Sequence, residues 1–308
     1  MTVSGTASNV SPPAGRSRLG KWWASGDALP YILLLPSLAA IGIVIFYPFL
    51  SGLYYSLTDG SLLRAGNFVG LDNYIQLFGM RDFHNALWFS LLFAVANVAG
   101  CFLLGLGLAL LMNMEMPGRA FFRVALLLPW IIPSVVSIVS WRWMVSDQHA
   151  IFNQIIRLFG GDAIFFLASE GWAQFMVILI KIWRSFPFMM LSLLAALQGI
   201  DRTLYEAAAL DGASKWQMFW NITLPQLRDI SIVLCLLMTI WTVNDFDTPW
   251  LLTQGGPSNA TENLVVLAHK YTFARNELGV GSAISFVTLL ILLVFIVFML
   301  RKQKNPQA

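Results

Sequence analysis

The chain has 308 residues, of which only 19 are Lys or Arg and 16 are Asp or Glu, so charged side chains make up 11% where a soluble domain carries about a quarter. Apolar residues reach 57% and the mean hydropathy is +0.70, which excludes a soluble protein of this length and predicts an integral membrane protein. The net charge of +3, without a long basic run, excludes a nucleic-acid partner.

Six segments come close to the run of about 20 apolar residues that a helix needs to cross ~30 Å of hydrocarbon. The sequence therefore predicts an all-α integral membrane protein with one six-span domain over residues 30–300, with spans at about 31–57, 86–112, 124–145, 172–197, 230–250 and 283–300. Residues 1–29 are expected to be a disordered tail and residues 301–308 a short second tail. The apolar run that follows the first tail is too long for a signal peptide and lacks a cleavage site, so we expect an uncleaved first span.

The prolines, cysteines and histidines of the chain indicate structural roles and not a reactive site. Pro129 and Pro133 predict kinks in the third span, and Pro187 predicts one in the fourth. Cys101 and Cys235 lie in apolar stretches and are expected to be buried structural thiols. The three histidines are far apart and lack H-E-x-x-H spacing, so the sequence predicts no metal centre and no catalytic site.

The distribution of Lys and Arg predicts the orientation, because cytoplasmic loops carry an excess of these residues. Eleven lie in the N-terminal tail, the 113–123 and 198–229 loops and the C-terminal tail, against five in the loops between them. An even number of spans returns the chain to the side where it began, so we expect both termini in the cytoplasm.

Five charged residues fall inside the predicted spans: Arg142, Lys181, Arg184, Asp245 and Asp247. Intramembrane charges are costly and usually line a cavity or a pathway. Arg142 and the two acids lie towards the outer ends of their spans, where snorkelling to the interface explains them as well as function does. Lys181 and Arg184 lie deeper and are the better pathway candidates.

The predicted cytoplasmic loop, residues 198–229, is patterned for two short helices. Thr203-x-x-Glu206 fits a capping box, and Asp201 is a second possible N-cap. Residues 204–210 favour helix. Gly212 suits a C-cap or a close backbone approach.

The second short helix has one aromatic face, because Trp216, Phe219 and Trp220 fall at i, i+3 and i+4. Pro225 is expected to end it before the fifth span. Lipid headgroups and another protein are both open as partners for this face. An interfacial helix normally has a Lys/Arg-rich polar face, and this one has only Lys215, which favours a protein partner.

The stretch 206–225 resembles the EAA loop of binding-protein-dependent ABC importer permeases. It contains E-A-A, then Gly after three residues and I-x-L-P after nine more. In that family the loop forms coupling helices that dock into a cleft on a cytoplasmic ATPase subunit. Family members often have Pro where this chain has Asp201, and either residue can start a helix.

Other stretches are similar to the sugar-uptake permeases related to the maltose and glycerol-phosphate systems. They are residues 47–58, 68–74, 122–143, 183–188 and 251–262. The resemblance covers about residues 30–300. It implies residues for coupling to the ATPase at Glu206, Ala207, Ala208, Asp211, Gly212, Trp216, Phe219, Leu224 and Pro225.

The resemblance also implies partners. They are a second, homologous permease that forms a heterodimer, two ATPase subunits that bind ATP and Mg, an extracytoplasmic solute-binding protein, and the lipid bilayer of a bacterial cytoplasmic (inner) membrane. The implied substrate is a mono- or oligosaccharide, or a related polyol or glycerol phosphate, moved by alternating access. This chain has no G-x-x-x-x-G-K-[ST], and Gly100, Gly105 and Gly107 of the second span favour close helix packing over phosphate binding, so we expect no cofactor and no ATPase activity in it.

The substrate pathway is predicted from residue chemistry. Amides and carboxylates bind sugar hydroxyls, aromatic rings stack on sugar rings, and intramembrane charges mark pathways. The candidates are Asn97, Lys181, Trp183, Arg184, Asn244, Asp245 and Asp247. Asn97 has the alternative role of bridging helices, Trp is common at membrane interfaces, and the partner permease is an alternative location for most binding residues.

Three other classes are open at this stage. A secondary transporter driven by an ion gradient usually shows repeats in its two halves, and these spans show none. A membrane-embedded enzyme needs a cluster of reactive groups, and the nearest approach, Asn244-Asp245-Phe246-Asp247, puts its acids on different helix faces. A structural or receptor subunit is disfavoured by the coupling loop.

Overall fold

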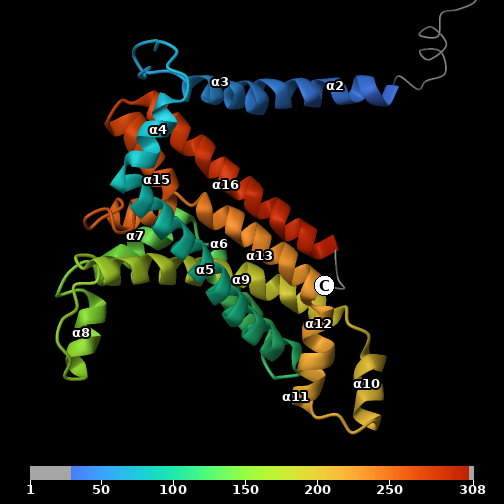
Figure 1. Cartoon of the computed structure of the whole chain (residues 1–308). Helices are drawn as coiled ribbons and strands as arrows, with labels where there is room; N and C mark the ends of the chain where they lie inside the picture. The colour runs from blue at the N-terminus through green and yellow to red at the C-terminus, as the bar shows by residue number, and fades with distance from the viewer. Residues whose placement is uncertain (1–28, 305–308) are drawn as a thin grey trace, which may run out of the picture. The chain divides into compact units, whose positions relative to one another are not determined.

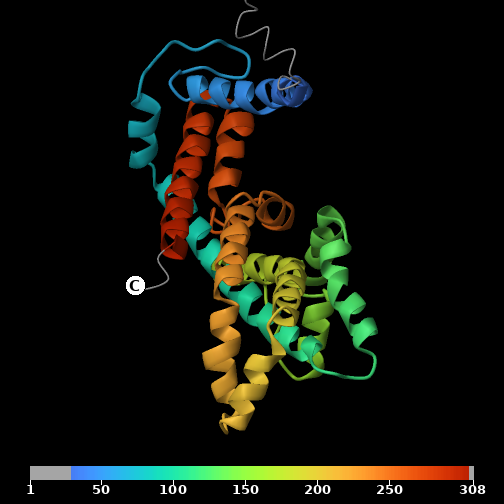
Figure 2. The same cartoon turned by 90° about the vertical axis from the view of Figure 1, so that its right-hand side faces the viewer.

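The computed structural model describes residues 29–304, and the regular structure in that range is helical. The chain divides into two compact units, Met1–Gly52 and Leu53–Ala308. Figures 1 and 2 show the helices from two directions.

The first unit is a single exposed apolar span. It holds α2 (Leu29–Ile41), the π-helical turn η1 (Gly42–Phe46) and the start of α3 (Tyr47–Tyr55). Together they give a candidate span, Leu33–Tyr55, with a mean hydropathy of 2.2 and 0% of its residues buried. Ile43 and Val44, for example, are 70% and 69% exposed. Such a surface is unfavourable in water, so this helix is suited to lipid or to another chain.

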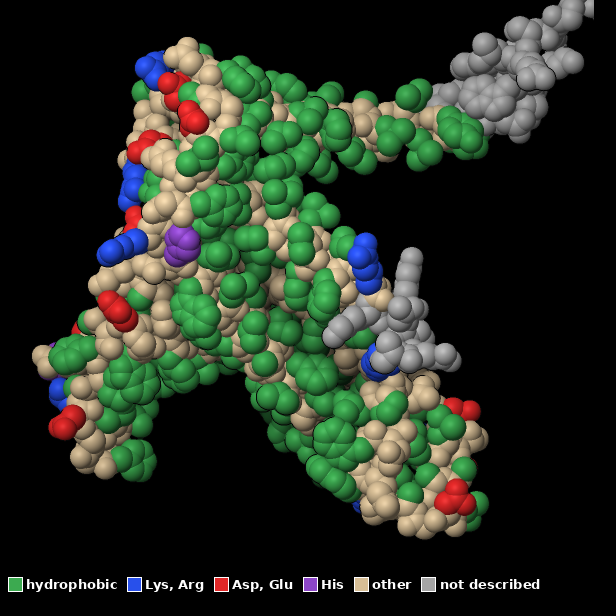
Figure 3. Space-filling view, viewed as in Figure 1, with side chains coloured by type: hydrophobic (Ala, Val, Ile, Leu, Met, Phe, Trp, Pro, Cys, Tyr) green, Lys and Arg blue, Asp and Glu red, His purple; other side chains and the backbone are tan. Residues whose placement is uncertain are grey.

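The second unit contains the remaining helices. They are α4 (Asp72–Gly79), α5 (Arg81–Asn113), α6 (Arg119–Ile131), α7 (Ser134–Val145), α8 (Ile151–Leu158), α9 (Glu170–Gln198), α10 (Arg202–Leu210), α11 (Lys215–Met218), η2 (Phe219–Thr223), α12 (Leu224–Gln226), α13 (Arg228–Val243), α14 (Asp247–Thr253), α15 (Leu264–His269), η3 (Lys270–Ala274) and α16 (Leu278–Lys304). Over the described residues, four helices are long and apolar enough to cross a membrane, and two bent pairs bring the number to as many as six. Hydrophobic side chains are spread over the visible face of this unit, and charged ones are few (Figure 3).

The third predicted span is broken. It consists of α6 and α7, which meet at an angle of 91°. Ile132, between them, is extended because the residue before Pro133 is driven out of the α region, and this confirms the predicted distortion at Pro133. Pro129 and Pro187 interrupt neither α6 nor α9, since both helices continue through them.

The fifth predicted span, 230–250, is also interrupted. α13 ends at Val243 and α14 begins at Asp247. Pro249 explains the break, because it has no N–H to donate to the carbonyl of Asp245 and its ring would clash with that carbonyl in a helix. Asn263 donates to the same carbonyl instead, over 2.7 Å.

The centre of the second unit is the packing of α5 along α9, with α13 beside both (Figures 1 and 2). A Cβ at Gly105 would lie 2.8 Å from Cγ of Met189, and one at Gly100 would overlap Ile182. The predicted role of these two glycines in close helix packing is confirmed. For Gly107 it is wrong, because the space around it is open.

Candidate functional site

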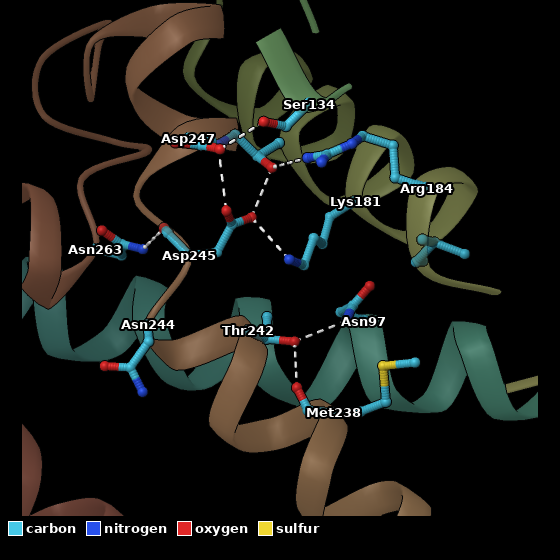
Figure 4. Close-up of polar contacts among 12 residues, drawn as sticks. Asn97, Ser134, Lys181, Arg184, Met238, Thr242, Asn244, Asp245, Asp247 and Asn263 are labelled. Atoms are coloured by element: carbon cyan, nitrogen blue, oxygen red, sulfur yellow. Dashed lines mark hydrogen bonds and ion pairs between the residues drawn. The ribbon is translucent and has the colours of Figure 1, made fainter. Parts of the chain in front are cut away.

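The break in the fifth span brings four of the five intramembrane charges, Lys181, Arg184, Asp245 and Asp247, together in what we call the charged cluster (Figure 4). Lys181 and Arg184, one turn apart on α9, point towards the segment between α13 and α14. Nζ of Lys181 lies 3.1 Å from Oδ2 of Asp245, and the two side chains are only 12% and 8% exposed. Asp245 is therefore half of a buried ion pair, and snorkelling to the interface does not describe it.

Thr248 connects Arg184 to this pair. Its hydroxyl donates to Oδ2 of Asp245 over 2.6 Å and accepts from Nη1 of Arg184 over 3.3 Å. Its backbone N–H points at Oδ1 of Asp245 over 3.4 Å. Nε of Arg184 is buried and has no hydrogen-bond partner in the described part of the chain, so the guanidinium retains an unused donor.

Asp247 connects the start of α14, after the break in the fifth span, to the start of α7, after the break in the third. The hydroxyl of Ser134, the first residue of α7, donates to Oδ2 of Asp247 over 2.7 Å. Arg142, the remaining intramembrane charge, is exposed and donates from Nη1 to the carbonyl of Leu251 over 3.3 Å. Side-chain contacts thus hold α7 against α14 at both ends of α7.

Asn263 anchors the broken segment from the other side. While its Nδ2 binds the carbonyl of Asp245, its Oδ1 accepts from the N–H of Val266 over 2.9 Å and so caps α15. The backbone N–H of Leu264, the residue after Asn263, donates to the hydroxyl of Ser90 on α5 over 2.9 Å. α5 and α15 are therefore fixed at the level of the break.

Sequence reasoning missed three members of this cluster: Ser134, Thr248 and Asn263. The available signal was the pair of helix-breaking prolines, Pro133 and Pro249. A broken helix inside a membrane frees backbone groups that need polar partners nearby.

Asn97, one of the predicted pathway residues, bridges two helices. It is fully buried on α5, and its Nδ2 donates to the hydroxyl of Thr242 on α13 over 2.7 Å. Its Oδ1 accepts from Sγ of Cys101 over 3.4 Å. These contacts use both ends of the amide.

Trp183 and Asn244 also lie apart from the charged cluster. Trp183 packs against Trp141, with ring centroids 5.5 Å apart. Asn244 is exposed and points away from the cluster (Figure 4), and it donates to the carbonyl of Ile240 over 2.9 Å. It lines a cavity of about 600 Å³ formed by α13, α15, η3 and α16.

The loop after α14 is fixed by a buried carboxylate. Glu262 is 2% exposed and pairs with Lys270, which also donates to Oδ1 of Asn259 over 3.2 Å. Burial raises the pKa of Glu262, and the neighbouring ammonium opposes that shift. Gln174 of α9 donates to the carbonyl of Ala260 over 2.7 Å, so the loop is tied to α9 as well.

The loop between α9 and α13 folds as the predicted helix–glycine–helix. α10 begins after Asp201, whose carboxylate accepts the N–H of Thr203 over 2.9 Å. This bond lowers the pKa of Asp201. The capping box predicted at Thr203 and Glu206 is wrong, because both residues lie inside α10 and an N-cap must have non-helical angles.

A capping box does occur at the start of α11. The hydroxyl of Ser214 accepts the N–H of Gln217, and the side chain of Gln217 accepts the N–H of Ser214. Gly212, between α10 and α11, has φ +81°, a left-handed conformation that favours glycine and confirms the predicted turn. Pro225 lies in α12, one residue before the second helix ends at Gln226, and the chain bends by 62° between that helix and α13, close to where the sequence predicts the end.

Several apolar and acidic side chains on the surface of this loop are exposed. The ring of Trp216 packs against those of Phe219 and Trp220, with centroids 6.1 and 5.6 Å away, yet Trp216 is 69% exposed. Leu210 is 90% exposed. Glu206 is exposed and forms no hydrogen bond or ion pair with any other described side chain. These groups are available to a partner.

Residues 101–305, which include the charged cluster and this loop, match the family described as "Binding-protein-dependent transport system inner membrane component". The chain belongs to this family. It is 35% identical over 274 residues (89% of this chain, 92% of the relative) to the trehalose/maltose transport system permease protein MalF of Thermococcus litoralis. It is 34% identical over 273 residues (88% and 89%) to the sulfoquinovosyl glycerol transport system permease protein SmoG of Agrobacterium fabrum.

The fold is shared with solved ABC importers. A crystal structure of a bacterial ABC transporter involved in the import of the acidic polysaccharide alginate matches with a TM-score of 0.83 and 23% identity, over 94% of this chain and 100% of that one. The all-α ABC importer permease fold is thus confirmed. As a member of this family, the chain is a permease component of an ABC importer, and the ion-gradient carrier is set aside.

Proposed function

We propose that the chain is the membrane permease of an ATP-driven importer for a mono- or oligosaccharide or a related polyol or glycerol phosphate. The transport systems named for its relatives handle trehalose, maltose and a sulfoquinovosyl glycerol, which supports a carbohydrate substrate. The observation that carries the proposal is the loop between α9 and α13. It is a well-formed helix–glycine–helix that exposes Trp216, Leu210 and an unpaired Glu206.

The proposed complex contains a second homologous permease, two ATPase subunits that bind ATP and Mg, and a solute-binding protein outside the membrane. In support, one matching structure is described as a transporter in complex with an alginate pentasaccharide-bound periplasmic protein. ATP-driven closure of the ATPase pair pulls the coupling helices together and opens the permeases outward, and hydrolysis reverses the change. Glu206 makes a charged contact in the ATPase cleft, and Gly212 permits the turn.

The proposed orientation places both termini and the coupling loop in the cytoplasm of a bacterial cell. The eleven-to-five division of Lys and Arg supports it. The charged cluster then lies towards the outer half of the membrane. There it would hold the broken third and fifth spans against α9, beside the path of the sugar.

The coupling contact is tested by cross-linking. A photoreactive maleimide is attached to Asp211→Cys in the assembled transporter, where the native Cys101 and Cys235 are buried and half-buried. We expect a cross-link to the ATPase subunit, and labelling only after the cells are opened. Arg157→Cys, exposed on α8, is the control and should label from outside without that cross-link. Outside labelling at position 211 would contradict the orientation.

The sugar class is tested with the solute-binding protein of the same system. The protein is titrated calorimetrically with mono-, di- and trisaccharides, polyols and glycerol phosphates. One of them should bind with a micromolar or lower Kd, which corresponds to a binding free energy of about −8 kcal/mol or more negative. Binding of amino acids or metal ions in their place would contradict a carbohydrate importer while leaving the coupling contact intact.

A further inference from the structure

A second cavity lies behind the coupling helices, away from the charged cluster. Its volume is about 870 Å³, and its wall is built from the end of α5, the loop after it, the start of α6, the end of α9, α10, and α11 with η2. Glu115, Arg119, Arg202 and Lys215 line it. It therefore joins the inner ends of two spans to both coupling helices.

The wall of this cavity has an excess of cations. Arg119, Arg202 and Lys215 face a single acid, Glu115. Within residues 29–304, none of the three cations forms a side-chain hydrogen bond or an ion pair, whereas Lys270 is paired with Glu262. Unpaired like charges around one cavity repel each other, and a bound anion would remove that repulsion.

Further donors lie close by. Arg123, one turn after Arg119 on α6, donates from Nη2 to the carbonyl of Met112 over 3.3 Å, and its Nε is buried without a hydrogen-bond partner in the described part of the chain. The hydroxyls of Tyr205 and Thr223, 2.9 Å apart, also line the cavity. The wall thus offers charged and neutral donors together.

We propose that this cavity binds a phosphate-bearing anion. Arginine side chains bind phosphate oxygens in pairs, and basic pockets at the cytoplasmic ends of membrane helices suit anionic headgroups. The span side of the wall is apolar, with Leu110 and Leu197, and can accept the start of an acyl chain. The two sources of this chemistry are an anionic phospholipid and a soluble phosphate.

A bound anion would fix α10 and α11 relative to the ends of α5 and α9, and would thereby set the position of the coupling helices. This inference uses the orientation proposed above, which places the cavity at the cytoplasmic surface. Binding is measured separately from uptake. A transporter that binds the anion but takes up no sugar would contradict the proposed function alone.

The test compares the assembled transporter with the variant Arg119→Gln/Arg202→Gln/Lys215→Gln. Native mass spectrometry follows titration with phosphatidylglycerol, with net-neutral phosphatidylcholine and, separately, with inorganic phosphate. Each cation near an anionic lipid contributes about a fivefold factor in affinity, so the triple variant should bind about 100-fold more weakly. Arg228→Gln, an exposed cation in the first turn of α13 outside the cavity, should stay within about twofold.

Loss of phosphatidylglycerol binding with no response to phosphate identifies a lipid site, and the reverse identifies a soluble ligand. If the triple variant does not assemble, the single variant Arg119→Gln, outside the coupling loop, should still show a fivefold loss. The proposal is overturned if the native transporter binds neither anion, or if Arg228→Gln weakens binding as much as the cavity variants do.

Discussion

Removing one partner of the buried Lys181–Asp245 pair should destabilise the helix bundle, whereas removing both should cost no more than the worse single change. The pair is 3.1 Å apart, and neither side chain is more than 12% exposed. Breaking such a pair costs about 3–5 kcal/mol, because an uncompensated charge stays buried.

The two single variants differ in the buried charge that each leaves behind and in the contacts that this charge keeps. In Lys181→Met, Asp245 still accepts the hydroxyl of Thr248 at 2.6 Å, so we expect a loss near 3 kcal/mol. In Asp245→Asn, the ammonium of Lys181 loses its carboxylate and has no other ion pair among the described residues, so we expect a loss nearer 5 kcal/mol. In the double variant neither member of the pair leaves the other behind as a buried charge without its partner, which should give a coupling energy of about 3 kcal/mol or more.

The assay is equilibrium unfolding of the assembled transporter in mixed micelles of rising SDS content, followed by tryptophan fluorescence. Arg142→Gln is the matched control, because its charge lies in a span but is exposed, and it should change stability by less than about 1 kcal/mol. The reasoning is refuted if the two single losses simply add in the double variant, or if each is under about 1 kcal/mol.

Four further predictions concern single positions. Gly212→Val forces a β-branched residue to φ +81° at a cost of about 1–2 kcal/mol, and uptake should be lost while ATP hydrolysis continues; normal uptake would contradict the coupling role. Asn97→Leu should lower the free energy of unfolding by about 1–3 kcal/mol, because it leaves Thr242 without its donor. Asn244→Ala should leave stability unchanged and slow uptake, and unchanged uptake would exclude Asn244 from the pathway. The lowered pKa of Asp201 means that its cap is fully present above about pH 4 and is lost as the pH falls through that lowered value. Hydrogen-exchange protection of the Thr203 amide should therefore hold from pH 6 down to about pH 4 and fall as the pH is lowered further, but not in Asp201→Asn, and equal loss in both would argue against the cap.

The membrane class, the approximate spans and the helix–glycine–helix form of the loop between α9 and α13 could be predicted because each depends on local information. Apolar run length determines which segments cross the membrane. The turn at Gly212 follows from a glycine after a helical run, and its φ of +81° agrees. The aromatic face of α11 and η2 follows from spacing alone.

The break in the fifth span was not predicted, because its partners are distant in sequence. Asn263 lies 18 residues after Asp245, and Ser134 lies 113 residues before Asp247. Only the fold brings these groups together. Pro249 alone was a local signal, and it predicts where the helix stops but not what replaces the lost hydrogen bond.

The pathway prediction mixed residues of similar chemistry and different positions. An asparagine in a span can face a neighbouring helix, as Asn97 does, or an open cavity, as Asn244 does. Composition cannot separate the two, because the outcome depends on how each helix is rotated against its neighbours. The distance between Lys181 and Asp245 is likewise a property of packing between α9 and the broken span.

The most direct test of the central claim is sugar uptake by the reconstituted transporter in proteoliposomes. With the second permease, the ATPase subunits and the loaded solute-binding protein present, uptake should require ATP and the binding protein, persist when ion gradients are collapsed, and stop in Gly212→Val. Uptake driven by an ion gradient without ATP would contradict the account.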